Sequence, residues 1–162
     1  MRNAECGIKR REKTAMGNAI MLDDEMRLIN ETTTTEDLKD IGFTTDKNGN
    51  SFTISKFCME VETPSDTTGA SAVVYLNNTK MANIGQFASR NHTNHCMMFF
   101  GEFFAGHAVI KGSYMSSWGS NANAWQCTAR KVAYEYLQNL SICMNTSDGR
   151  FPAGTVVRLF GR

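Results

Sequence analysis

The chain has 162 residues, of which 41% are apolar and 20% charged, and these values are ordinary for a single globular domain. Its net charge of +1 argues against a surface dedicated to coating nucleic acid, because such surfaces are usually strongly basic. No apolar run approaches the roughly 20 residues of a membrane helix, and no secretory signal is visible. We therefore expect a cytoplasmic protein that has no membrane partner.

The number and positions of the cysteines also favour the cytoplasm. Their number is odd, five, and four of them lie within apolar segments: Cys58, Cys96, Cys127 and Cys143. This usage is typical of free thiols in a reducing environment rather than of a disulfide framework.

The first 18 residues lack a hydrophobic period and are predicted to form a basic N-terminal arm, followed by a single α+β domain over residues 19–162. Four cations gather in the arm: Lys9, Arg10, Arg11 and Lys13. They could bind an acidic protein surface or the phosphates of a nucleic acid. The neutral overall charge favours a solvated tail or a protein contact over nucleic acid.

The next segments are expected to be short. Residues 19–29 carry an imperfect helical stripe, and the acids after the threonine run at 32–35 predict a short helix that ends at Gly42. Asp46 to Asn50 contains Asn-Gly and predicts a β-hairpin turn between strands at 43–45 and 51–62.

Residues 71–146 show the clearest pattern. Strands are expected at 71–76, 96–100, 103–114 and 141–144, and amphipathic helices at 78–90 and 121–140. The longer helix is predicted from apolar residues spaced by three or four: Trp125, Ala129, Val132, Tyr136 and Leu140. This β-α-β-β-α-β order predicts a ferredoxin-like, split βαβ sheet covered by two helices. A last strand is expected at 155–160.

The run from Cys96 to Phe100 is apolar throughout, as in a strand that is buried on both faces. One face would contact the helices, so the other also needs a cover. The N-terminal segments or a second subunit could supply it. Phe103 and Phe104 extend this aromatic region and are candidates for a binding surface.

His92, His95 and His107, with Glu102 nearby, are the candidate catalytic or metal-ligating residues. A zinc site would need three or four such ligands to converge, and the helical His-Glu-x-x-His pattern is absent. A polar loop leading into a buried strand explains His92 and His95 equally simply. We therefore expect neither a metal nor a cofactor.

Two other chemistries fit poorly. A reactive cysteine needs an electropositive, partly exposed setting, and only Cys6 in the arm approaches this. The Asp46–Asn50 segment has its glycine at the fourth place of a calcium loop and Phe57 at the twelfth, where the loop requires glutamate.

The absence of a catalytic pattern favours a small non-enzymatic interaction protein. It would modulate a macromolecular partner, or assemble with copies of itself through an aromatic-rich sheet surface. The alternative is a small hydrolase or ligand-binding protein, metal-dependent in one version, that uses His92, His95 and His107 at a cleft or subunit interface.

Overall fold

The computed structural model describes residues 26–64, 72–84, 95–115, 122–145 and 147–162. All regular structure in these ranges is β-strand, and they contain no helix. The ten strands are β1 (Arg27–Thr33), β2 (Asp40–Phe43), β3 (Lys56–Thr63), β4 (Ala72–Leu76), β5 (Thr79–Ile84), β6 (His95–Phe104), β7 (His107–Met115), β8 (Ala122–Lys131), β9 (Leu140–Met144) and β10 (Val156–Gly161). The predicted α+β, ferredoxin-like fold is therefore wrong.

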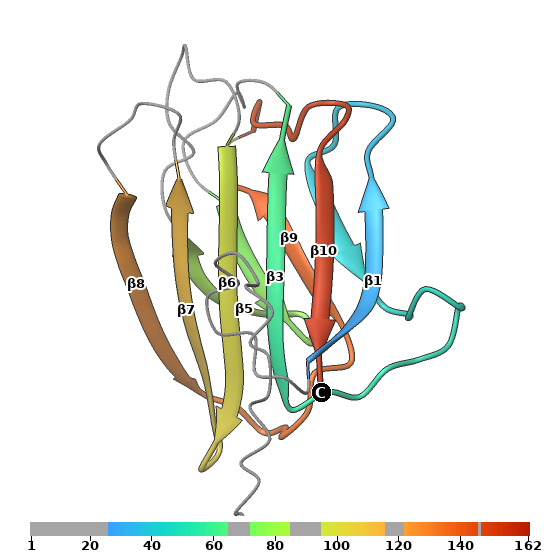
Figure 1. The fold of residues 1–162 in the computed structure, drawn as a ribbon. Helices are drawn as coiled ribbons and strands as arrows, with labels where there is room; N and C mark the ends of the chain where they lie inside the picture. The colour runs from blue at the N-terminus through green and yellow to red at the C-terminus, as the bar shows by residue number, and fades with distance from the viewer. Residues whose placement is uncertain (1–25, 65–71, 85–94, 116–121, 146) are drawn as a thin grey trace, which may run out of the picture.

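The strands form two antiparallel sheets. The larger has the order β1-β10-β3-β6-β7-β8 and the smaller the order β2-β9-β4-β5. Figure 1 shows the six strands of the larger sheet side by side, with strands of the smaller sheet behind them. Consecutive strands alternate between the sheets from β1 to β4, so most neighbours within a sheet are distant in sequence. The exceptions are the consecutive pairs β4–β5, β6–β7 and β7–β8.

This connectivity is that of a jelly roll. Eight strands suffice for it: β1, β10, β3 and β6 in one sheet, and β2, β9, β4 and β5 in the other. The remaining two, β7 and β8, continue the larger sheet beyond β6. They are inserted between the sixth and seventh strands of the jelly roll, and they widen the outer face of that sheet.

The core lies between the sheets. Successive strand residues point to opposite faces, so every second side chain enters the interior. Phe57, Met59 and Val61 of β3 thus meet side chains of the smaller sheet such as Leu140 and Ile142 in one buried cluster. Gly101 is required beside Phe57, because a Cβ there would lie 2.1 Å from the ring.

Both long predicted helices are corrected. Within 78–90, residues 79–84 form β5, and the rest lie outside the described residues. Within 121–140, residues 122–131 form β8, and residues 132–139 form an irregular connection to β9. In that connection Leu137 and Ile54 exchange backbone hydrogen bonds of 2.8 and 3.1 Å. Of the predicted stripe, Val132 and Leu140 contact the core, whereas Ala129 and Tyr136 are exposed, so the spacing of three and four does not mark one buried face.

The shorter predicted elements also differ. In place of a helix over residues 36–41, Leu38 makes an isolated bridge to Phe151 and β2 begins at Asp40. The described end of the 19–29 stripe belongs to β1. The predicted arm at residues 1–18, and with it Lys9, Arg10, Arg11 and Lys13, lies outside the described residues. Among the described residues, no helix is long and apolar enough to span a membrane.

The Asp46–Asn50 turn is present, but it does not form a hairpin. The Asp46 carboxylate accepts hydrogen bonds from the backbone N–H groups of Asn48 and Asn50, at 2.8 and 2.9 Å. The strands on its two sides enter different sheets, since β2 pairs with β9 whereas β3 pairs with β10 and β6. The loop instead covers the edge of β1, where Lys47 N–H donates to the Ile29 carbonyl at 2.8 Å. Covered edges protect a sheet from pairing with other chains.

Candidate functional site

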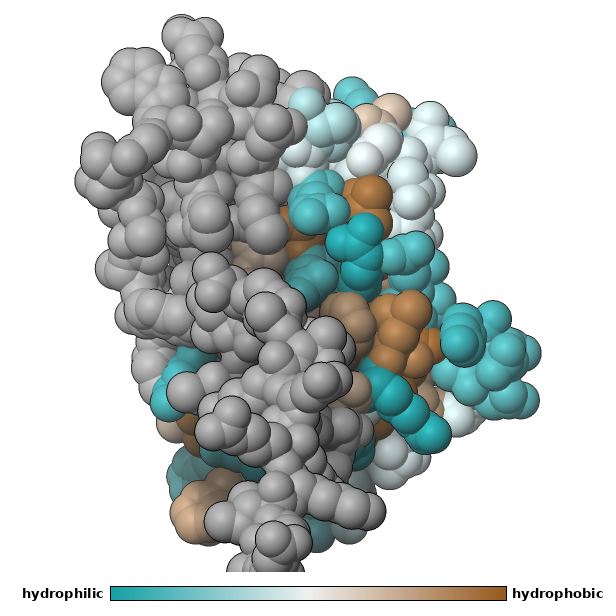
Figure 2. Space-filling view, viewed as in Figure 1, coloured by the Kyte–Doolittle hydropathy of each residue, from teal (hydrophilic) through white to brown (hydrophobic). Residues whose placement is uncertain are grey.

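An apolar band crosses the outer face of the larger sheet. Leu28 of β1, Phe160 of β10, Cys58 of β3 and Phe100 of β6 are opposite one another on successive strands. Leu28 is 37% exposed, and both phenylalanines retain part of their surface. In the coloured part of this face, Figure 2 shows hydrophobic and hydrophilic side chains next to one another. A sheet face that only meets water has no need of such a band.

Cys58 lies in the middle of this band and is fully buried. Burial, reinforced by the negative charge of Glu60, raises the pKa of its thiol to about 12. The thiol therefore stays protonated at neutral pH and acts as a small apolar side chain. Cys58 contributes packing to the band rather than nucleophilic chemistry.

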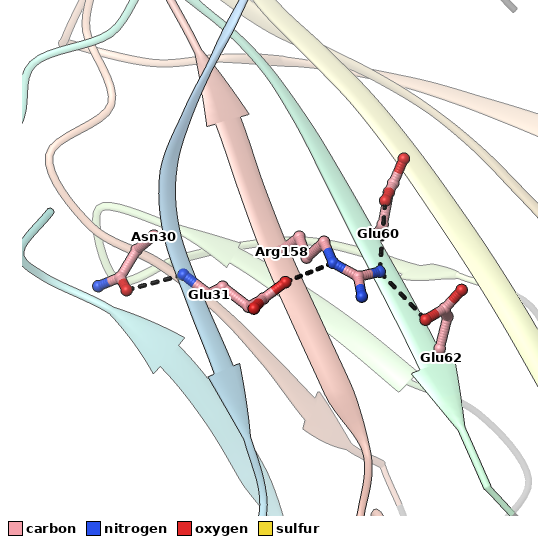
Figure 3. Close-up of polar contacts among 5 residues, drawn as sticks. All are labelled: Asn30, Glu31, Glu60, Glu62 and Arg158. Atoms are coloured by element: carbon pink, nitrogen blue, oxygen red, sulfur yellow. Dashed lines mark hydrogen bonds and ion pairs between the residues drawn. The ribbon is translucent and has the colours of Figure 1, made fainter. Parts of the chain in front are cut away.

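A cluster of charged side chains borders the band. Figure 3 shows Arg158 of β10 between Glu31 of β1 and two glutamates of β3, Glu60 and Glu62. Its Nε donates to Glu31 at 2.5 Å, and its Nη1 lies 3.0 Å from Glu62 and 3.8 Å from Glu60. The hydrogen bonds to Glu62 and Glu31 raise the pKa of the guanidinium further above its ordinary value. Because three carboxylates surround one cation, this part of the face is acidic.

The opposite part of the same face carries lysines. Strand alternation places Lys56 and Lys131 there, on the outer side of β3 and β8. Lys111 of β7 is opposite Phe100 and continues the row of the band. Glu102 is the carboxylate on β6 here, and its Oε2 lies 3.6 Å from Lys56 Nζ. The apolar band thus runs between an acidic region and a region where lysines outnumber carboxylates.

The histidine group predicted from the sequence is not brought together in the described residues. His92 lies outside them. His95 begins β6, whereas His107 follows the other end of that strand and pairs with Phe104. At about 3.3 Å per residue, the strand separates the two backbones by roughly 30 Å. His107 is exposed with its Nδ1 3.0 Å from the Ala105 carbonyl, and Glu102 is paired with Lys56.

No group of three or more His, Cys, Asp or Glu in the described ranges could hold a metal ion. The metal-dependent version of the enzyme hypothesis therefore gains no geometric support from this part of the chain.

The two phenylalanines at the end of β6 point in opposite directions. Phe103 packs against the core and meets Tyr134 edge-to-face, with the ring centroids 5.6 Å apart. Phe104 is 73% exposed beside the turn to β7. Of these two rings, Phe104 is therefore the one that offers an aromatic surface to a partner, and it lies on the lysine-bearing side of the larger sheet.

Sequence reasoning did not identify the outer-face residues Leu28, Glu31, Glu60, Glu62, Arg158 and Phe160. The sequence did contain a signal for some of them. In Glu60-Val61-Glu62 and in Val157-Arg158-Leu159, charged and apolar residues alternate, as in a strand whose charged side chains face outward. The pairing of β1, β10 and β3 gathers them, and it joins segments more than 90 residues apart. No protein-family model matches this chain, and no curated protein does either.

Proposed function

We propose that the protein is a non-enzymatic interaction module that self-associates through the outer face of its larger sheet. The observation that supports this function is the apolar band of Leu28, Phe160, Cys58 and Phe100 between two regions of opposite charge. Interfaces are enriched in aromatic residues and arginine at their centre and in polar groups at their rim. A second copy of the chain is the occupant that matches both features.

Charge complementarity favours a second copy over an unrelated partner. When two identical faces pack about a two-fold axis that runs along the band, the acidic region of each copy opposes the lysine-bearing region of the other. Arg158 and its three glutamates would then face Lys56 of the second copy. The same rotation places the two bands on one another and removes the exposed parts of Leu28, Phe160 and Phe100 from water.

Analytical ultracentrifugation between about 1 and 100 μM tests this proposal. The wild-type chain should sediment as an oligomer whose fraction rises with concentration. Phe160→Glu places a charge in the band, and loss of a central aromatic contact typically costs about 2 kcal/mol or more. The dissociation constant should therefore rise at least tenfold.

Tyr136→Glu is the matched control, because Tyr136 is 51% exposed but lies in the connection between β8 and β9, away from the band. Lys56→Glu should also weaken association by opposing carboxylates to the acidic region. Lys39→Glu makes the same charge change beside β2 and should not. A monomer at all concentrations, or equal association of Phe160→Glu and Tyr136→Glu, would reject the proposal.

A further inference from the structure

A second surface lies on the outer face of the smaller sheet. Five residues line a shallow pocket there of about 330 Å³: Asp40, Tyr75, Asn78, Ser141 and Cys143. This volume is at the lower end of the roughly 300–1,000 Å³ of small-molecule sites. The pocket combines one aromatic ring with a carboxylate, an amide and a hydroxyl.

The strands hold four of these residues in a fixed arrangement. Tyr75 of β4 is opposite Ser141 of β9, and Asp40 of β2 is opposite Cys143 of β9. Gly42 is the other neighbour of Ser141, and a Cβ at Gly42 would lie 2.9 Å from Ser141 Cβ. Because Gly42 has no side chain, the space beside the Ser141 hydroxyl stays open to a ligand. Sites built on paired strands hold their groups more precisely than sites on loops.

A network of amides fixes the fifth residue. Asn77 and Asn78 form the β4–β5 turn with positive φ angles of 45° and 63°, a conformation that asparagine tolerates. Asn77 Oδ1 accepts the backbone N–H groups of Gln138 and Asn139, at 2.8 and 3.0 Å. Asn139 Nδ2 donates to Asn78 Oδ1 at 3.0 Å. Because Oδ1 is engaged, the amide is oriented and the Asn78 Nδ2 group can serve as a donor to a ligand.

We propose that this pocket binds a neutral saccharide. The apolar C–H face of a sugar ring packs on an aromatic ring such as Tyr75, and its hydroxyls match the acceptors of Asp40 and the donors of Asn78 and Ser141. Among the described residues, the lining contains a carboxylate and no cation, which disfavours phosphates and acidic sugars. Lys80 is opposite Tyr75 on β5 but is not among the lining residues.

Saturation-transfer NMR with the methyl glycosides of glucose, galactose, mannose and N-acetylglucosamine tests the proposal, with sialyllactose as an acidic probe. At least one neutral glycoside should bind, with a dissociation constant on the order of 1 mM because the pocket is shallow. Tyr75→Ala should weaken that binding at least tenfold, whereas Tyr75→Phe should retain most of it. Tyr136→Ala removes another exposed tyrosine and should change nothing.

Alkylation supplies a readout that does not depend on NMR. Cys143 lines the pocket and is partly exposed, whereas Cys58 is buried on the other sheet. Peptide mapping after iodoacetamide treatment should show that the bound glycoside slows the modification of Cys143 and leaves that of Cys58 unchanged.

Three results would overturn the saccharide site. The first is the absence of both saturation transfer and Cys143 protection for every neutral glycoside at about 50 mM, well above the expected constant. The second is binding that Tyr75→Ala leaves intact. The third is a preference for sialyllactose over its neutral counterpart lactose. None of these results bears on self-association, because that proposal concerns the other sheet.

Discussion

Asp46 shows how a single exposed carboxylate can influence stability through its backbone. Its Oδ1 accepts the N–H groups of Asn48 and Asn50, and these hydrogen bonds, that of Asn50 first, lower the pKa of the carboxyl in the folded protein. In the unfolded chain the pKa of this carboxyl returns to its ordinary value of about 4. Its contribution to stability is therefore fully present above about pH 4 and is lost as the pH falls through the lower, folded-state pKa.

The variant Asp46→Asn tests this linkage. The amide still offers an oxygen to the two N–H groups but does not titrate, so stability should depend less on pH between about 4 and 2. Urea midpoints of both proteins at pH 7, 4, 3 and 2 provide the comparison. The two proteins should converge as the pH falls. Parallel curves over the whole range would show that Asp46 does not titrate differently in the folded state.

At the scale of elements, the β6–β7 turn carries an alanine, Ala105, at a position where the turn geometry favours asparagine or glycine. Ala105 and Gly106 both have positive φ angles, 48° and 73°, as in a two-residue type I′ turn. A side chain in this left-handed region costs roughly 1–2 kcal/mol, and asparagine tolerates it best among residues with a Cβ.

Ala105→Asn creates the Asn-Gly pair that type I′ turns prefer and should raise the free energy of unfolding by about 0.5–1 kcal/mol. Thermal and urea unfolding measure the effect. Ala105→Val, with a branched side chain at the same position, should destabilise the protein. If asparagine and valine had the same effect, the left-handed conformation would not limit the stability of this hairpin.

The elements that the sequence predicts well are those whose information is local. The strand segments near 71–76, 96–100, 141–144 and 155–160 are present as β4, β6, β9 and β10. The predicted 103–114 strand is β7 only from His107, because β6 continues to Phe104 and the turn lies inside the predicted range. Apolar, β-branched and aromatic residues indicate strands wherever they pair. The same local information failed at β8, where Trp125 and Ala129 begin a helical stripe although the segment is a strand.

Local sequence patterns do not show which strands pair with one another. A helix satisfies its own hydrogen bonds, but a strand takes its partners from distant segments, as β10 does from β1 and β3. The Arg158 cluster exists only because of that pairing, and so does the pocket between Asp40, Tyr75 and Ser141. The expectation that the β6 strand is apolar on both faces predicted a cover on that sheet, but it did not predict the band or its charges.

At the scale of the whole molecule, the two proposed surfaces lie on the outer faces of different sheets, with the shared core between them. Self-association through the larger sheet would therefore leave the pockets of the smaller sheet directed away from the interface. In the proposed face-to-face dimer, the two pockets would point in opposite directions. Such a dimer would not place both pockets on one flat surface, but it would bridge two particles that carry the same saccharide.

This arrangement predicts that Phe160→Glu separates bridging from intrinsic affinity. The wild-type dimer should cross-link beads coated with the bound saccharide, which light scattering detects as aggregation, whereas the monomeric variant should not. For a free monovalent glycoside in solution, the two proteins should bind equally, because Phe160 lies on the opposite sheet from Tyr75. Solution NMR beside the bead assay makes the comparison. A variant that loses both modes of binding would show that the two faces are coupled through the core, and one that still cross-links the beads would show that self-association does not join the two pockets.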